Sequence, residues 1–136
     1  MRLTSRYRFS ASHRLDTPAL SPEENRKLYG KCNNPHGHGH DYVLDIIVDG
    51  PVDANGQVVN REALDALVRE RVLARLDHKN INTDIPELAG SVTTTENLAS
   101  LVQGALTAGW TLPARLARVR ISETARNTFE LEVPRA

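Results

Sequence analysis

The chain has 136 residues, of which 40% are hydrophobic and 25% charged, and its 17 basic residues balance its 17 acidic ones. This length and composition predict one globular domain, residues 1–136. The zero formal net charge gives no electrostatic reason to expect a nucleic-acid or anionic-membrane partner. No apolar run approaches the ~20 residues of a membrane span, and the N-terminal residues lack the apolar core of a signal peptide. One cysteine cannot form an internal disulfide, so we expect a cytoplasmic protein with a free thiol.

The first half of the chain predicts two strands with a short helix between them. Apolar and aromatic residues alternate over residues 3–15, as in a strand with one buried face. Ser21-Pro22-Glu23-Glu24 has the form of a capping box with proline at the first helical position, which predicts a helical turn to about Leu28. Residues 30–39 are rich in Gly, Asn and Pro and should form a loop. A strand is expected from His40 to Gly50.

The second half predicts two helices followed by two strands. Asn60 can cap a helix over residues 61–75, whose leucines and valines fall at helical spacing. Thr93-x-x-Glu96 has a second capping-box pattern and should open a helix that ends near Gly109. Residues 116–122 and 128–133 then have the character of strands. The order ββααββ predicts an α+β domain with a four-stranded antiparallel sheet and two helices on one face.

The stretch GKCNNPHGHGHDY holds three of the five histidines and the only cysteine. Catalytic zinc commonly takes three protein ligands and leaves a fourth position open. Two histidines at i and i+2 can reach one ion from an extended backbone, because alternate side chains share a face. His36 with His38 and His38 with His40 both have this spacing. The second pair is favoured, because His40 leads directly into the predicted strand.

A third ligand has to come from elsewhere in the chain. His13 ends the first predicted strand, which can pair with the strand that begins at His40; His78 is the other remaining histidine. The alternative is a group of solvated loop histidines, and spacing alone supports the two interpretations equally.

Four further residues have side chains suited to catalysis or binding. A nearby cation or metal would lower the pKa of the Cys32 thiol and favour the thiolate, although Cys32 could also be the fourth ligand of a closed structural zinc site. Asp77-His78 could orient a catalytic group or share its proton; without other information a loop-entry cap is favoured. Glu123 could bind the amide-like edge of a ligand, but taken alone it is a surface residue.

Taken together and in this order, these stretches resemble the 6-pyruvoyltetrahydropterin synthase family. The shared segments are FSASHRL (9–15), EEN (23–25), YGKCNNPHGHGHDY (29–42), LDHKNIN (76–82), TTENLA (94–99) and SET (122–124). The resemblance implies the tunnelling fold (T-fold), which agrees with the predicted order of strands and helices. It also implies a homohexamer, a dimer of trimers stacked head to head with sites between subunits.

The resemblance implies metal-binding and catalytic roles residue by residue. His13, His38 and His40 match the family's zinc ligands, in agreement with the favoured register. Cys32 matches the catalytic base. The Asp77-His78 pair matches its partners, and the hexamer implies that this pair could meet Cys32 across a subunit boundary.

The resemblance also implies the substrate and the reaction. Glu123 matches the carboxylate that anchors the pterin ring, and Thr94, Thr95 and Glu96 match a segment that lines the pterin pocket. The implied enzyme is a lyase that converts 7,8-dihydroneopterin triphosphate to 6-pyruvoyltetrahydropterin and triphosphate in tetrahydrobiopterin biosynthesis. Zn²⁺ would acidify the substrate's side-chain hydroxyls and the Cys32 thiolate would take a proton.

Two other functions stay open at this point. 6-Carboxytetrahydropterin synthase of queuosine biosynthesis acts on the same substrate, and its motif has three residues between the cysteine and HGH. Cys32 to His38 has five between, the spacing typical of pyruvoyl enzymes, but Cys32 to His36 has three. A folate-pathway branch usually has Glu in place of the cysteine, so Cys32 counts against it. The alternative from another class is a non-enzymatic, zinc-stabilised assembly protein.

Overall fold

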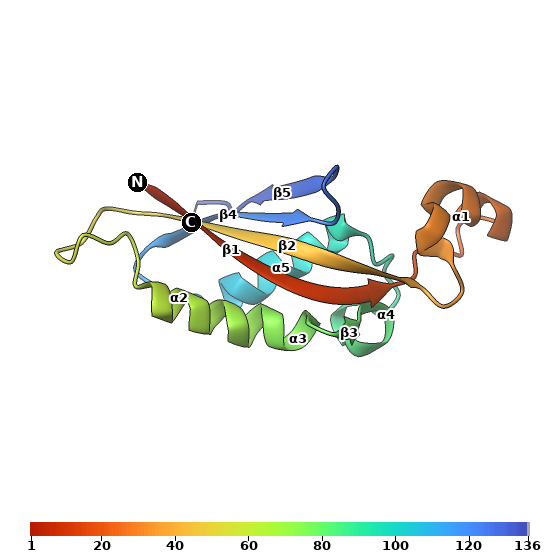
Figure 1. Cartoon of the computed structure of the whole chain (residues 1–136), viewed down its shortest axis with the longest axis horizontal. Helices are drawn as coiled ribbons and strands as arrows, with labels where there is room; N and C mark the ends of the chain where they lie inside the picture. Colours follow the sequence, from red (N-terminus) through yellow and green to blue (C-terminus); the bar gives the residue numbers. More distant parts are fainter. Residues whose placement is uncertain (136) are drawn as a thin grey trace.

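The computed structural model describes residues 1–135 and shows a five-stranded mixed sheet with its long helices on one face (Figure 1). The strands lie in the order β3-β1-β2-β4-β5. Their bounds are Arg2–His13 for β1, His38–Asp49 for β2, Lys79–Asn80 for β3, Arg115–Ser122 for β4 and Thr128–Glu132 for β5. The expected four antiparallel strands are present, and the sheet gains β3, which runs parallel to β1 at its edge. The predicted sheet was therefore wrong by one strand, because two residues are too few to give an alternating pattern.

The helices agree with the predicted order, with several short turns added. They are α1 (Pro22–Tyr29), α2 (Arg61–Val68), α3 (Ala74–Leu76), α4 (Ile81–Asp84) and α5 (Thr95–Gly109). Two 3₁₀ turns, η1 (Gly30–Asn33) and η3 (Pro86–Leu88), and a π turn, η2 (Arg69–Leu73), complete the set. Together α2, η2 and α3 form one helical run that corresponds to the helix predicted over residues 61–75.

The two predicted capping boxes have different outcomes. Ser21 accepts a hydrogen bond from the Glu24 amide, and the Glu24 side chain accepts one from the Ser21 amide, so the box before α1 is confirmed. The box predicted at Thr93 is wrong: Thr94 is the N-cap of α5 and accepts from the Asn97 amide. The reason is that Thr93 is buried and makes contacts with the end of β1 instead.

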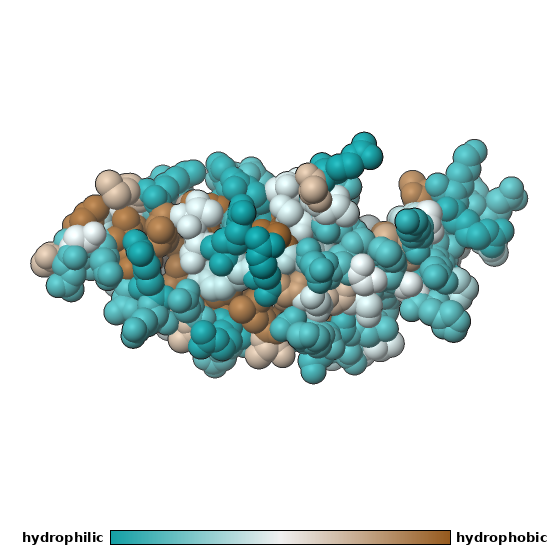
Figure 2. All heavy atoms as spheres, viewed as in Figure 1, coloured by the Kyte–Doolittle hydropathy of each residue, from teal (hydrophilic) through white to brown (hydrophobic). Residues whose placement is uncertain are grey.

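The hydrophobic core lies between the sheet and the α2–α3 and α5 helices. Along β2, alternate side chains from Tyr42 to Val48 are buried and join one core cluster with Leu98 and Leu106 of α5. The α1 lobe projects from the end of the sheet where β1 stops and β2 starts (Figure 1), and its visible face is mostly hydrophilic (Figure 2). In residues 1–135, no helix has both the length and the apolar character of a membrane span.

Candidate metal and pterin site

The site begins at the end of the sheet, where the pairing of β1 with β2 gathers three histidines. His13 lies opposite His38, and Ala11 lies opposite His40. The ring of His40 stands edge-on to both other rings, with centroids 4.9 Å from His13 and 4.8 Å from His38. His13 is buried, whereas His38 is exposed. The extended backbone places His38 and His40 on one face, as the i, i+2 spacing predicted.

Four potential metal ligands converge on one point: His13, Cys32, His40 and Glu123, whose donor atoms all lie within 4.8 Å of one another. The Nε2 atoms of the two histidines are 3.1 Å apart. The Cys32 Sγ lies 3.6 Å from His40 Nε2, and Glu123 Oε1 lies 3.1 Å from that same nitrogen. These four residues are called the ligand cluster below.

Three members of the ligand cluster are held by contacts with the backbone. His13 Nδ1 lies 2.7 Å from the Thr93 carbonyl oxygen. A carbonyl only accepts hydrogen bonds, so Nδ1 carries the proton and the Nε2 lone pair faces the cluster. The Cys32 carbonyl accepts a hydrogen bond from the Leu15 amide at 2.7 Å, which ties η1 to the chain after β1. Glu123 directly follows β4, and its amide donates to the Asn127 carbonyl across the hairpin.

The ligand cluster fits a bound metal ion. Imidazole nitrogens, a thiolate and a carboxylate are all ligands of zinc and related ions, and zinc–nitrogen bonds are about 2.0–2.1 Å long. Two nitrogens 3.1 Å apart can therefore share one ion. The Thr93 carbonyl behind His13 is the kind of outer contact that fixes the tautomer of a metal-binding histidine. The residues are thus compatible with a metal site.

Electrostatics inside the cluster favour a cation. Burial, and then the Glu123 carboxylate, raise the pKa of the Cys32 thiol. Burial lowers the pKa of His40, and the neighbouring His13 and His38 lower it further against the opposing effect of Glu123. A neutral His40 has a free lone pair, as metal binding requires. A positive ion among these groups would reverse the effect on Cys32 and stabilise its thiolate.

The sequence matches a known protein family along nearly its whole length. Residues 2–134 match the 6-pyruvoyl tetrahydropterin synthase family. The chain is 42% identical over 133 residues to the Drosophila melanogaster 6-pyruvoyl tetrahydrobiopterin synthase, covering 97% of this chain and 79% of that one. It is 45% identical over 127 residues to the human protein of the same name, covering 92% and 86%.

The chain belongs to the 6-pyruvoyl tetrahydropterin synthase family.

A solved structure supports the same relationship at the level of the fold. The Caenorhabditis elegans 6-pyruvoyl tetrahydropterin synthase superposes with a TM-score of 0.90 at 35% identity, and the match covers 98% of this chain and 96% of that chain.

Not all of the synthase-like residues singled out in the sequence meet in one place. His13, His40, Cys32 and Glu123 do. His38 lies beside His40 but outside the ligand cluster, with its side chain exposed. Thr93, whose carbonyl orients His13, was not among the predicted site residues. A threonine before a helix gives only a capping signal, so no pattern in the sequence could have revealed this contact.

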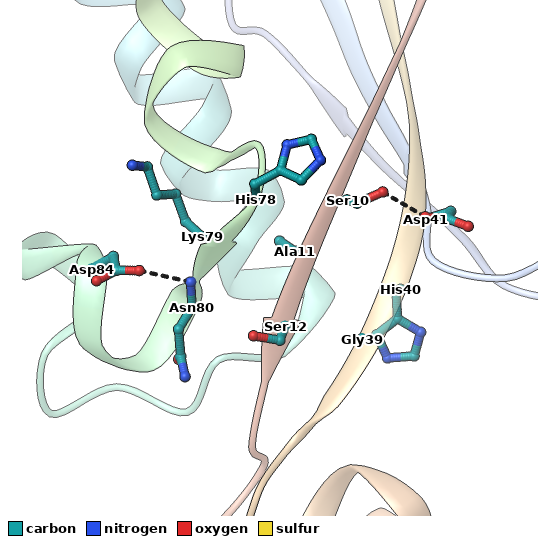
Figure 3. Close-up of a pocket in the computed structure, with 10 residues that line it drawn as sticks. All are labelled: Ser10, Ala11, Ser12, Gly39, His40, Asp41, His78, Lys79, Asn80 and Asp84. Carbon is teal, nitrogen blue, oxygen red and sulfur yellow. Dashed lines mark hydrogen bonds between the residues drawn. The ribbon is translucent and has the colours of Figure 1, made fainter.

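The Asp77-His78 pair lies at the opposite edge of β1. Asp77 accepts a hydrogen bond from the Ser10 amide, His78 donates its own amide to the Ser10 carbonyl, and the two side chains are 3.1 Å apart. Figure 3 shows His78 and His40 on either side of β1, around a hollow of about 550 Å³. The His78 side chain is 83% exposed and lies against Asp77. The Asp77 carboxylate and the His78 amide make their hydrogen bonds to Ser10 of β1 and not to Cys32.

The predicted pterin-lining residues Thr94, Thr95 and Glu96 lie at the start of α5. Thr94 caps the helix, Thr95 is buried and Glu96 is exposed in the first turn. The three predicted pterin-lining residues thus differ sharply in their surroundings. Only Thr95 has a side chain enclosed by the protein.

Gly37 offers a specific test of the site's construction. Its φ is +80°, and a Cβ there would lie 2.8 Å from the His13 carbonyl oxygen. Gly37→Ala should therefore push the start of β2 away from β1 and lower metal retention as well as melting temperature. Gly56→Ala is the matched control, because Gly56 has a φ of +78° but open space around it. In both variants an alanine is held at a positive φ, and this backbone strain costs about 1–2 kcal/mol.

The measurement is the melting temperature together with the metal content after dialysis. We expect Gly56→Ala to lose stability and keep its metal, and Gly37→Ala to lose both. Equal metal retention by the two variants would contradict the importance of this close approach.

Proposed function

We propose that this chain is a metal-dependent 6-pyruvoyl tetrahydropterin synthase. It would act as a carbon–oxygen lyase, converting 7,8-dihydroneopterin triphosphate to 6-pyruvoyltetrahydropterin and inorganic triphosphate. Family membership supports the reaction class. The observation that carries the proposal is the convergence of His13, Cys32, His40 and Glu123. Two imidazoles, a thiol and a carboxylate at one point are the groups that a metal-binding pair, a base and an anchoring carboxylate would require.

Zn²⁺ is the ion we propose for the site. His13 and His40 would hold it, with His38 as the third ligand from the neighbouring position on the same strand face. Bound there, the ion would polarise the substrate's side-chain hydroxyls. In this assignment Cys32 and Glu123 lie next to the metal without being required to bind it, which leaves both free for the substrate.

Cys32 is the proposed base. The reaction removes a proton from a carbon next to a hydroxyl and expels triphosphate, so it needs a basic group close to the side chain of the substrate. The Cys32 Sγ lies 3.6 Å from His40 Nε2, at the edge of the ligand cluster. Once its pKa is lowered by a cation, the thiolate can accept the proton in the pH range where the protein is folded.

Glu123 is the proposed anchor for the pterin ring. Its carboxylate is largely enclosed, with 15% of the side chain exposed. An ionised carboxylate accepts two hydrogen bonds side by side, which matches the adjacent amino and ring N–H donors of a pterin. This contact would fix the ring so that the substrate side chain reaches Cys32 and the metal.

A hexamer would account for the position of the Asp77-His78 pair. Within one chain the pair lies across β1 from the ligand cluster, and His78 borders the hollow in Figure 3. We propose that assembly brings the pair of one subunit to Cys32 of another, where it would share the proton. Thr94 and Glu96 are proposed to line the pterin pocket with Thr95.

The second candidate is 6-carboxytetrahydropterin synthase activity. It rests on the alternative reading of the HGH motif, in which His36 and His38 would bind the metal. The geometry favours the pyruvoyl spacing instead, because His40 lies in the ligand cluster while His36 is exposed in the loop before β2. The mass of the pterin product distinguishes the two activities.

Metal removal tests the proposed elimination. Protein dialysed against a chelator should release triphosphate from 7,8-dihydroneopterin triphosphate at least about 100-fold more slowly than the metal-loaded form, because the polarising ion contributes several kcal/mol to such reactions. Adding Zn²⁺ should restore the rate. Equal rates of triphosphate release with and without the metal would contradict the proposal.

A further inference from the structure

The proposed base, Cys32, lies on a short turn rather than on a strand or a long helix. Its element, η1, is a 3₁₀ turn of four residues, and such turns have poorer hydrogen-bond geometry than an α-helix. The bond from the Asn34 amide to the Lys31 carbonyl closes this turn and does not link it to the sheet. Contacts from outside the turn therefore have to set the position of Cys32 relative to the histidines.

These contacts come from the segment that follows β1. The Leu15 amide donates a hydrogen bond to the Cys32 carbonyl at 2.7 Å. In the other direction, Asn33 Nδ2 donates to the Leu15 carbonyl at 2.6 Å. The side-chain amide of Asn33 thus takes the place of a backbone N–H, and Leu15 is bonded to η1 through both its N–H and its C=O. Two residues in an antiparallel ladder exchange a pair of bonds in the same way.

Asn33 makes two more hydrogen bonds to the same segment. Its Nδ2 also donates to Asp16 Oδ1 at 3.0 Å, and its carbonyl accepts from Arg14 Nε at 3.3 Å. Asn33 is only 4% exposed, so these partners replace water as its hydrogen-bonding environment. All three residues after His13 are therefore bonded to Asn33, which joins the end of the strand that carries this histidine to the turn that carries the thiol.

We propose that Asn33 is a positioning residue, which acts on the reaction by fixing Cys32 against the ligand cluster. The inference rests on the proposed function, because it takes Cys32 to be the base. The Cys32 Sγ lies 3.6 Å from His40 Nε2, and without the Asn33 side chain Leu15 keeps only one of its two bonds to the turn. A displacement of about 1 Å at a reacting group can cost on the order of 100-fold in rate.

Asn25 provides the matched control. It is 2% exposed, and its amide exchanges hydrogen bonds with the backbone of Thr17, Leu20 and Ser21, in the loop before α1. None of these bonds reaches η1. Asn25→Ala and Asn33→Ala are thus the same substitution at two buried, hydrogen-bonded amides, and only one of the two is joined to the turn that carries Cys32.

The experiment measures kcat for triphosphate release, the Kd for neopterin, the metal content and the melting temperature of each metal-loaded protein. Both variants should melt at a lower temperature than the wild type, because each leaves buried backbone groups unpaired. Asn33→Ala should lower kcat by about 10–100-fold with unchanged neopterin Kd and metal content. Asn25→Ala should keep the wild-type kcat.

The same substitution in Cys32→Ser protein shows whether Asn33 acts through the thiol. A residue that acts only by positioning Cys32 has no further effect on turnover once the thiol is absent. Asn33→Ala should therefore leave the residual kcat of Cys32→Ser unchanged, while it still lowers the melting temperature of that protein.

Asp16→Ala is a milder variant that does not endanger folding, because the Asp16 side chain is 40% exposed. It removes one of the two acceptors of the Asn33 amide and should lower kcat about threefold, the effect of one ordinary hydrogen bond. This decrease, too, should be absent from Cys32→Ser protein.

Two results would overturn the inference. One is an Asn33→Ala protein whose kcat equals that of Asn25→Ala. The other is a decrease in kcat by the same factor with and without the Cys32 thiol, because Asn33 would then serve the fold as a whole. If Asn33→Ala does not fold, a wild-type kcat in Asp16→Ala overturns it. A wild-type protein without turnover would instead contradict the proposed function itself.

Discussion

Cys32→Ser should lower kcat by about 10²–10⁴-fold while the protein keeps its fold, its metal and its affinity for neopterin. The range is that expected for loss of a positioned base. Serine preserves the shape of the side chain, but its hydroxyl is far less acidic than a thiol near a cation. The measurement is triphosphate release from 7,8-dihydroneopterin triphosphate, with metal content and neopterin binding determined on the same preparation.

The properties that Cys32→Ser loses distinguish a catalytic base from a structural metal ligand. If Cys32 completes a closed zinc site, the serine variant should lose metal and melting temperature together with activity. The thiol of the wild-type protein offers a second comparison. A catalytic Cys32 should react readily with a thiol reagent and be protected by neopterin, whereas a zinc-bound one should react slowly until the metal is chelated. Unchanged turnover in Cys32→Ser would contradict the assignment of the base.

Glu123→Gln should weaken neopterin binding by about 10–100-fold. The carboxylate would accept two hydrogen bonds from the pterin, and hydrogen bonds to a charged group contribute about 1.5–3 kcal/mol. Glutamine fills the same space but brings an N–H₂ group toward the pterin's donors. The Kd for neopterin, measured by fluorescence titration with metal-loaded protein, is the direct readout.

Glu130→Gln is the matched control for this substitution. Glu130 lies on β5, next to β4, the strand that Glu123 directly follows, and it pairs with Arg120 away from the ligand cluster. The Glu130→Gln protein should bind neopterin with the same Kd as the wild type. Because Glu123 also lies 3.1 Å from His40, metal content has to be measured for both proteins. Equal affinities in the two variants would show that Glu123 does not anchor the ring.

The parts of the fold that the sequence predicted are those with a long regular pattern. The four long strands and the helical run over residues 61–75 have alternating or helical spacing, and the structure contains all of them. The strand β3 and the turns η1, η3 and α4 are two to four residues long, too short for periodicity to appear. The one misplaced cap, at Thr93 instead of Thr94, arose because three consecutive threonines offer the same capping chemistry.

The ligand cluster was only partly predictable for a different reason. The i, i+2 spacing of His38 and His40, with His13 at a matching strand end, is a pattern compatible with a shared metal, but spacing alone supports solvated loop histidines equally. The approach of Glu123 to His40 depends on the pairing of β2 with β4, which joins positions about 80 residues apart and leaves no local signal. The role of Thr93 likewise appears only from a buried contact.

The identity of the reaction product tests the central claim most directly. Metal-loaded protein would be incubated with 7,8-dihydroneopterin triphosphate, and the pterin product identified by mass spectrometry. The proposed function predicts 6-pyruvoyltetrahydropterin together with inorganic triphosphate, formed by wild-type protein and not by Cys32→Ser. A carboxypterin accompanied by acetaldehyde would contradict the claim and assign the same site to the carboxy reaction. No turnover by metal-loaded wild-type protein would contradict it too, and would leave the ligand cluster with a structural role.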